Sequence, residues 1–275
     1  MISFVVVVVC IYFAVAGGMY LKQRSFQYFP QHSAKIGFEV PAKFGLDGFI
    51  VASIGTSDGE TLGSWLALPP TKDAPLILYM HGNAGTLGDR AERFRVFHEE
   101  GFGVLALSWR GYGGSTGTPT EKGLMKDGRA AMKFLQQQGV PASRVILFGE
   151  SLGSGVATQL AADPDTSPLA VVLEAPYTTA ADVARKRYWF LPIELLMKDQ
   201  FRSIDFASRV TAPVFVFHGT ADRIVPYAQG KRLYDTFTGP KEFLSMEGNG
   251  HIDPLTEVSW GAIKAFLASN GAAPK

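Results

Sequence analysis

The sequence has little cysteine and almost no net charge. Cys10 is the one cysteine among 275 residues, which excludes an intrachain disulfide and a metal site built from cysteines. The formal net charge is +1, and no cluster of Lys and Arg alternates with aromatic residues, so nucleic acid is not an expected partner. No pattern indicates a metal, nucleotide or flavin, and we expect no cofactor. The length and the 47% hydrophobic content suit one sizeable core.

Charge is also missing from the beginning of the chain. Residues 2–21 contain no Asp, Glu, Lys or Arg, and as a helix they would extend about 30 Å, the thickness of a bilayer's hydrocarbon core. The sequence therefore predicts a transmembrane anchor at residues 1–22 and a juxtamembrane linker at 23–35. The alternative is a signal peptide with a small-residue cleavage site at residues 14–16, but no basic residue precedes the apolar run.

The basic residues near this segment all follow it. Lys22, Arg24 and Lys35 come after the apolar run, whereas only the α-amino group precedes it. By the positive-inside rule this arrangement favours a cytoplasmic location for the rest of the chain. The sequence gives no indication of an oligomeric state.

Residues 36–270 follow the pattern of an α/β domain. Short strand-like runs at 38–40, 48–54 and 61–68, separated by turn residues, indicate an antiparallel beginning of a sheet. Five near-continuous apolar runs follow and alternate with helical stretches, as buried parallel strands do. These runs begin at Leu76, Val104, Val145, Ala170 and Val214. We predict a mostly parallel, doubly wound sheet, whose ligands bind at the carboxyl ends of the strands.

A serine between two glycines follows the apolar run at residues 145–148. Gly149 and Gly153 lie two residues before and after Ser151, where a sharp turn from strand to helix would leave no room for a side chain. The same Gly-x-Ser-x-Gly pattern surrounds Ser115, but there the strand ends earlier and a turn signal follows. The context therefore predicts Ser151 as a nucleophile.

A serine hydroxyl needs a base, usually an imidazole, and a carboxylate that orients the base. We predict His251 as the base, because it lies in a glycine-rich loop after the last strand-like run. The predicted acid is Asp222, which follows the run at 214–217, although a turn or helix-cap role would also explain it. Asp253 is too close to His251 in sequence, and Glu150 lies inside the serine turn. The other histidines have structural explanations at loop, helix or strand-end positions: His32, His81, His98 and His218.

Negative charge that develops on a substrate oxygen needs fixed hydrogen-bond donors, which are commonly backbone N–H groups. The residue after the nucleophile, Leu152, is one expected donor. The other is expected from the glycine-containing loop at residues 81–85, where we predict Asn83, although a structural turn explains the same composition.

These motifs together resemble the α/β-hydrolase superfamily over about residues 36–270. The resemblance includes the loop at residues 81–85, the segment at 110–115 and the serine turn, and the chain order Ser151, Asp222, His251 is the one expected of that superfamily. Within it, the chain looks most like membrane-anchored serine hydrolases with an Arg-x-x-x-Tyr-x-Pro segment, here residues 24–30 with one residue more. That branch is similar to the protein-depalmitoylating thioesterases of eukaryotes, which have a cysteine-rich N-terminus in place of a spanning segment.

A long insertion at residues 176–212 separates two of the predicted core strands. It is rich in aromatic and aliphatic residues, and we predict that Tyr177, Trp189 and Phe190 bind substrate if the insertion forms a cap. Ordinary packing on the core is an equal alternative.

The predicted activity is hydrolysis of an ester or thioester with a hydrophobic acyl group, through an acyl-Ser151 intermediate. The predicted partners are an acyl-bearing, lipid-like or small-molecule substrate and the membrane. A peptidase or amidase of the same fold and a non-catalytic, membrane-tethered binding protein remain as alternatives.

Overall fold

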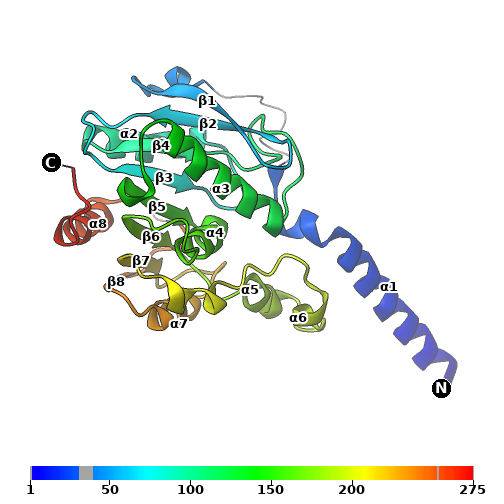
Figure 1. Ribbon diagram of the computed structural model, residues 1–275. Coiled ribbons are helices and arrows are strands. Elements are labelled where there is room, and N and C mark those ends of the chain that lie inside the picture. Colours follow the sequence, from blue (N-terminus) through cyan, green and yellow to red (C-terminus); the bar gives the residue numbers. More distant parts are fainter. Residues whose placement is uncertain (1, 31–39, 253, 275) are drawn as a thin grey trace.

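A single eight-stranded sheet with helices on both faces forms the body of the protein, and one long helix projects from it (Figure 1). The computed structural model describes residues 2–30, 40–252 and 254–274. The strands are β1 (Ile50–Gly55), β2 (Thr61–Ala67), β3 (Leu76–Met80), β4 (Gly103–Leu107), β5 (Val145–Glu150), β6 (Ala170–Glu174), β7 (Val214–Gly219) and β8 (Lys241–Met246).

The strand order is β1-β2-β4-β3-β5-β6-β7-β8. β2 pairs antiparallel with β1 and with β4, and every other pair is parallel. This confirms the predicted mostly parallel α/β sheet with an antiparallel beginning. The further strand expected at 38–40 involves Phe38 and Glu39, which lie outside the described residues.

The two faces of the sheet form separate hydrophobic layers, because alternate strand residues point to opposite sides. On one face Leu76, Leu78 and Met80 pack with α3 (Glu121–Gln137), α4 (Leu152–Ala161) and α7 (Tyr227–Thr236). On the other face Ile77 and Tyr79 pack with α2 (Ala91–Glu99) and α8 (Glu257–Ser269). Short 3-10 turns lie at Pro41–Phe44, Gly88–Arg90 and Ala142–Arg144. The carboxyl ends of the six parallel strands therefore lie at one edge, between two helical layers.

The projecting helix is α1 (Ile2–Gln27), whose 26 residues extend about 39 Å. It is long and apolar enough to cross a membrane, and it is almost entirely exposed. It continues past the expected anchor end at residue 22, so the expected linker begins as helix, and residues 31–35 of that linker lie outside the described residues. Between β6 and β7 the insertion folds into α5 (Ala180–Arg187), α6 (Ile193–Leu196) and two 3-10 turns, Ser203–Asp205 and Ala207–Arg209.

Candidate active site

The serine turn joins β5 directly to α4. Ser151 has φ 49° and ψ −111°, a strained conformation for a residue with a side chain. The flanking glycines are required by close packing: a Cβ on Gly149 would lie 2.6 Å from the Cα of Ser154, and a Cβ on Gly153 would lie 2.0 Å from the carbonyl oxygen of Met80. The local sequence is therefore explained by the sharp turn that presents the serine hydroxyl at the end of β5.

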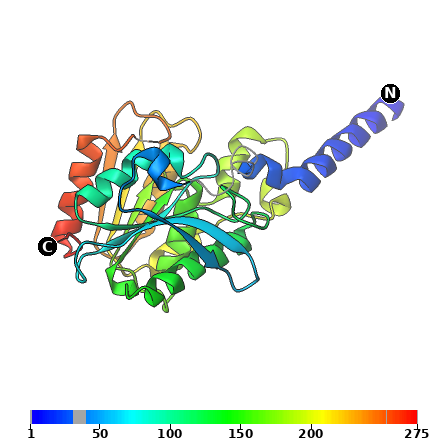
Figure 2. The ribbon, with the colours of Figure 1, turned by 90° about the horizontal axis from the view of Figure 1, so that it is seen from above.

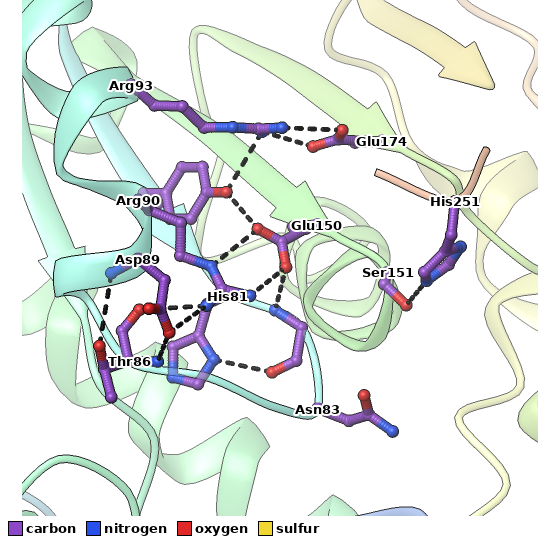
Figure 3. A network of polar contacts seen from close by, with 12 residues as sticks. His81, Asn83, Thr86, Asp89, Arg90, Arg93, Glu150, Ser151, Glu174 and His251 are labelled. Carbon is purple, nitrogen blue, oxygen red and sulfur yellow. Dashed lines mark hydrogen bonds and ion pairs between the residues drawn. The ribbon is translucent and has the colours of Figure 1, made fainter. Parts of the chain in front are cut away.

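The structure brings the three residues predicted for the triad together from the ends of three strands. Asp222 follows β7, and His251 follows β8. His251 Nε2 lies 2.8 Å from Ser151 Oγ, and His251 Nδ1 lies 2.7 Å from Asp222 Oδ2 (Figure 3 shows the serine and the histidine). Because a carboxylate only accepts hydrogen bonds, Nδ1 carries the hydrogen in the neutral imidazole, and Nε2 is then the acceptor for the serine hydroxyl.

The Asp222 carboxylate has a full set of donors. Its Oδ1 accepts from the N–H groups of Ile224 and Val225, at 2.8 and 2.9 Å, and its Oδ2 accepts from His251 and, at 3.1 Å, from Nε2 of His218. Burial raises the pKa of this carboxyl, but the hydrogen bonds from the two histidines outweigh burial and hold the pKa below its usual range. Asp222 is therefore ionised at neutral pH and held in one orientation toward His251.

His218 is a residue whose contact with the site was missed in the sequence. It ends β7, and its buried ring donates both to Asp222 and, at 3.0 Å, to the carbonyl of Val225. The four-residue spacing between His218 and Asp222 was the available signal, since both flank one short loop. His218 therefore helps to hold the Asp222 carboxylate in place, and it is not the histidine that contacts Ser151.

The loop at residues 81–85 is held against the serine turn from both sides. The Gly82 N–H donates to Glu150 Oε1 at 3.0 Å, and the Asn83 carbonyl accepts from the Tyr112 hydroxyl at 2.8 Å and from the Phe29 N–H at 3.0 Å. Leu152, the first residue of α4, has one of the N–H groups that a helix leaves without an intrahelical acceptor. The residue before Asn83, Gly82, lies against the serine, since a Cβ added to it would be 3.6 Å from the Cβ of Ser151. Leu152 is thus next to the serine in the chain, and the loop that contains Asn83 borders it.

His81, at the head of this loop, is fixed as a neutral ring. Its Nδ1 lies 2.7 Å from the Gly82 carbonyl, and its Nε2 accepts from the Trp109 N–H at 3.3 Å. Burial lowers its pKa to about 3. The structural explanation given for this histidine agrees with these contacts.

A buried network of charged groups lies beside the serine turn (Figure 3). Glu150 accepts from Arg90 Nη2 at 2.6 Å, from Arg90 Nε at 3.0 Å and from the Tyr79 hydroxyl. Arg93 contacts the Tyr79 hydroxyl and forms a two-point pair with Glu174 at 2.5 and 3.0 Å. Burial raises the pKa of Glu150, but the charge of Arg90 outweighs burial and keeps the carboxyl ionised.

This network was also missed in the sequence. It joins positions about 60 to 80 residues apart, and no motif or spacing in the sequence pointed to it.

The Arg-x-x-x-Tyr-x-Pro-like segment connects the end of α1 to the site. Arg24 pairs with Asp199 at 2.7 Å, and the Asn83 side chain donates to the Gln27 carbonyl at 2.9 Å. Tyr28 is buried, and the next residue, Phe29, donates to the Asn83 carbonyl. The end of the projecting helix is therefore bonded to the loop that borders Ser151.

Ser115 has a structural role, as the sequence context suggested. Its hydroxyl donates to the Ser108 carbonyl at 3.1 Å and accepts from the Gly63 N–H at 2.9 Å, and the side chain is buried. The hydrogen of this hydroxyl and one of its acceptor positions are therefore used within the fold.

The three residues proposed for substrate binding are placed apart from one another. Tyr177 is buried behind the serine turn, and its hydroxyl donates to the Leu152 carbonyl at 3.3 Å. Trp189 and Phe190 are exposed between α5 and α6, where the Phe190 carbonyl accepts from the Tyr12 hydroxyl of α1. Within the described ranges, no hydrogen bond or ring contact joins Trp189 or Phe190 to the triad. The residues of the described ranges also contain no group of three His, Cys, Asp or Glu side chains suited to a metal ion.

Comparison with known proteins places the chain among hydrolases. The model of the family described as "Serine aminopeptidase, S33" matches residues 71–199. The uncharacterized protein Rv2307c of Mycobacterium tuberculosis is 37% identical over 270 residues, which cover 94% of each chain. The lysophosphatidylserine lipase ABHD12 of Danio rerio is 32% identical over 230 residues, which cover 70% of this chain and 59% of that protein.

A solved esterase has the same fold. The esterase Pf2001 of Pyrococcus furiosus aligns over 85% of this chain and 94% of its own, with a TM-score of 0.68 and 18% sequence identity. At that identity the likeness extends to the fold alone.

Proposed function

Because this chain belongs to the α/β-hydrolase superfamily, we propose that it is a membrane-anchored serine hydrolase that cleaves esters or thioesters of hydrophobic acyl groups. The observation that carries the proposal is the position of the His251 ring, 2.8 Å from Ser151 Oγ on one side and 2.7 Å from Asp222 Oδ2 on the other. A ring held in this way removes the serine proton as the hydroxyl attacks.

The proposed reaction has two halves. In the first, His251 Nε2 takes the proton of Ser151 while Oγ bonds to the acyl carbon, and the N–H groups of Leu152 and Asn83 stabilise the oxyanion. The intermediate then collapses, the bond to the alcohol or thiol breaks, and the leaving group takes the proton from His251. In the second half, His251 takes a proton from water, the hydroxide attacks the acyl-Ser151 carbonyl, and the carboxylic acid is released as Ser151 regains its proton.

The lipid-like class of substrate is supported by two findings. One relative acts on a lysophospholipid by name, and α1 would hold the domain where lipid acyl groups are available. If the acyl chain is buried on binding, each methylene contributes about 0.8 kcal/mol, which is about fourfold in kcat/KM.

Turnover of p-nitrophenyl esters of increasing chain length tests this proposal. We expect kcat/KM to rise with acyl length and to vanish in Ser151→Ala. A flat profile would contradict the preference for hydrophobic acyl groups.

Amide cleavage is a second candidate, because the matching family model is named for an aminopeptidase. Aminoacyl p-nitroanilides should be cleaved far more slowly than the esters in the same buffer. Faster cleavage of the anilides would favour the peptidase. A protein inactive on both, with an unreactive Ser151, would instead be a membrane-tethered binding protein.

We further infer that α1 anchors the chain with its catalytic domain on the cytoplasmic side. Lys22 and Arg24 follow the apolar stretch, and basic residues are enriched on that side of a membrane. Protease added to sealed right-side-out vesicles should leave the domain intact, and its digestion without detergent would contradict the orientation.

A further inference from the structure

The connection between α5 and α6 has an exposed apolar surface. We call residues 188–197 the α5–α6 tip. Its side chains include Trp189, Phe190 and Leu195, which are 79%, 41% and 85% exposed. Large apolar groups gathered on a protein surface mark a contact with a partner or a membrane.

The α5–α6 tip and the residues just after it lie along α1. The Tyr12 hydroxyl donates to the Phe190 carbonyl at 3.0 Å, and the Gln23 side chain donates to the Leu196 carbonyl at 3.2 Å. Gln23 also accepts from the N–H of Lys198 at 2.7 Å. Figure 1 and Figure 2 both show α5 and α6 beside the domain-proximal part of α1. From Tyr12 to Gln23 these contacts extend over about 16 Å of the helix axis.

If the bilayer surrounded α1 only beyond its contact with the tip, too little of the helix would remain to cross it. Residues 2–11, beyond the contact at Tyr12, extend only about 15 Å, half of the roughly 30 Å of a hydrocarbon core. On the domain side of Tyr12, α1 still exposes apolar residues, including Phe13 at 67% and Leu21 at 79%. A bilayer that surrounds Phe13 and Leu21 also surrounds Phe190, because Phe190 contacts the neighbouring part of α1 at Tyr12.

We propose that the α5–α6 tip is a second membrane-contacting element, inserted into the leaflet through which α1 enters. The inference rests on the proposed anchoring by α1. In this position Trp189, Phe190 and Leu195 contact lipid acyl chains near the head groups, a depth that tryptophan favours.

The charged residues around the tip fit the same position. Arg185, Lys186 and Arg187 form the last turn of α5, and their long side chains can reach lipid head groups. Arg185 also pairs with Glu194 at 2.7 Å, so the acidic residue of α6 is not left alone near the lipid. A bilayer is favoured over a protein partner because the tip surface is continuous with α1 and bordered by basic residues. Attachment at two points would fix the orientation of the domain on the membrane.

Tryptophan fluorescence of the full chain in vesicles tests this proposal. The chain has four tryptophans, and Trp65, Trp109 and Trp260 are buried, so Trp189 is the exposed reporter. In vesicles of lipids brominated on their acyl chains, we expect loss of the Trp189 emission, taken as the difference between wild type and Trp189→Phe. Aqueous iodide should leave that emission unchanged.

Two probes in the Trp189→Phe background separate the possible failures. Phe13→Trp reports on α1 and should be quenched by brominated lipid. Val258→Trp places an exposed probe on α8, on the far side of the sheet from α1 in Figures 1 and 2, and should be quenched only by iodide. If Phe13→Trp is quenched by lipid while Trp189 is quenched by iodide, the tip proposal is wrong and the anchor stands. If neither responds to lipid, both the anchor and the tip proposal are wrong.

Discussion

Replacing Glu150 by glutamine should destabilise the protein far more than the loss of one charge at its surface. The Glu150 carboxylate is buried and accepts two bonds from Arg90, whose own side chain is only 14% exposed, in addition to those from Tyr79 and Gly82. The amide keeps the shape but leaves the Arg90 charge without its buried counterion, with only the exposed Asp89 carboxylate 3.9 Å away. Breaking a buried pair in this way costs about 3 to 5 kcal/mol. For a chain of this size we expect the Tm to fall by about 6 to 10 °C.

The matched control is Glu92→Gln. Glu92 pairs with Arg95 one turn along α2, and its side chain is 68% exposed. Such a surface pair contributes at most about 1 kcal/mol, so the Tm should change by about 2 °C or less. Thermal unfolding in detergent, followed by circular dichroism, measures both variants. If the two variants had equal Tm values, the buried network would not support the serine turn as described.

The pH dependence of the same variant provides a second test. Folding lowers the pKa of Glu150 from its ordinary value of 4.5. A group with a lowered pKa stabilises the fold fully above the unfolded value, and that stability is lost as the pH falls below it. The difference in stability between wild type and Glu150→Gln should therefore close by about 1.4 kcal/mol for each pH unit below 4.5. A difference that widens at acidic pH would refute this reasoning.

Four further variants test the site and the packing of the helices around it. Asp222→Asn keeps the shape of the acid but disturbs the orientation and tautomer of His251, so kcat on a p-nitrophenyl ester should fall by about 10⁴-fold, and a loss of less than tenfold would exclude the assigned role. Gly153→Ala should cost about 3 kcal/mol or more in unfolding measurements, because its Cβ would lie 2.0 Å from a carbonyl oxygen of β3, whereas Gly261→Ala on the open side of α8 should stabilise the helix by about 0.5 to 1 kcal/mol. Asn83→Ala retains the backbone N–H and should lower kcat less than about tenfold, and a loss of about 10²-fold or more would assign the role to its side chain instead.

The sequence was most informative where a motif coincides with the end of a strand. Ser151, Asp222 and His251 each follow an apolar run, which indicates a strand that ends just before the residue. Neighbouring parallel strands end at the same edge of the sheet, so the three residues are brought to that edge. The fold and the spatial meeting of these three residues could therefore be predicted. Their catalytic role remains a prediction.

Contacts between distant segments had no comparable signal. Arg90 reaches Glu150 across 60 residues, and Tyr12 reaches Phe190 across 178. In neither pair does the sequence around one residue show a periodicity or spacing that points to the other. These contacts form only when all the helices are packed on the sheet. For the same reason, the position of Trp189 and Phe190 beside α1 could not be predicted, and their role in substrate binding stays a prediction.

Labelling by a fluorophosphonate probe tests the central claim most directly, because the probe reacts only with an activated serine. The full chain should be labelled, Ser151→Ala should lose the label, and Ser115→Ala should keep it, since the Ser115 hydroxyl is bonded within the fold. Labelling that persists in folded Ser151→Ala, or an unlabelled wild type, would contradict the assignment of Ser151 as the nucleophile.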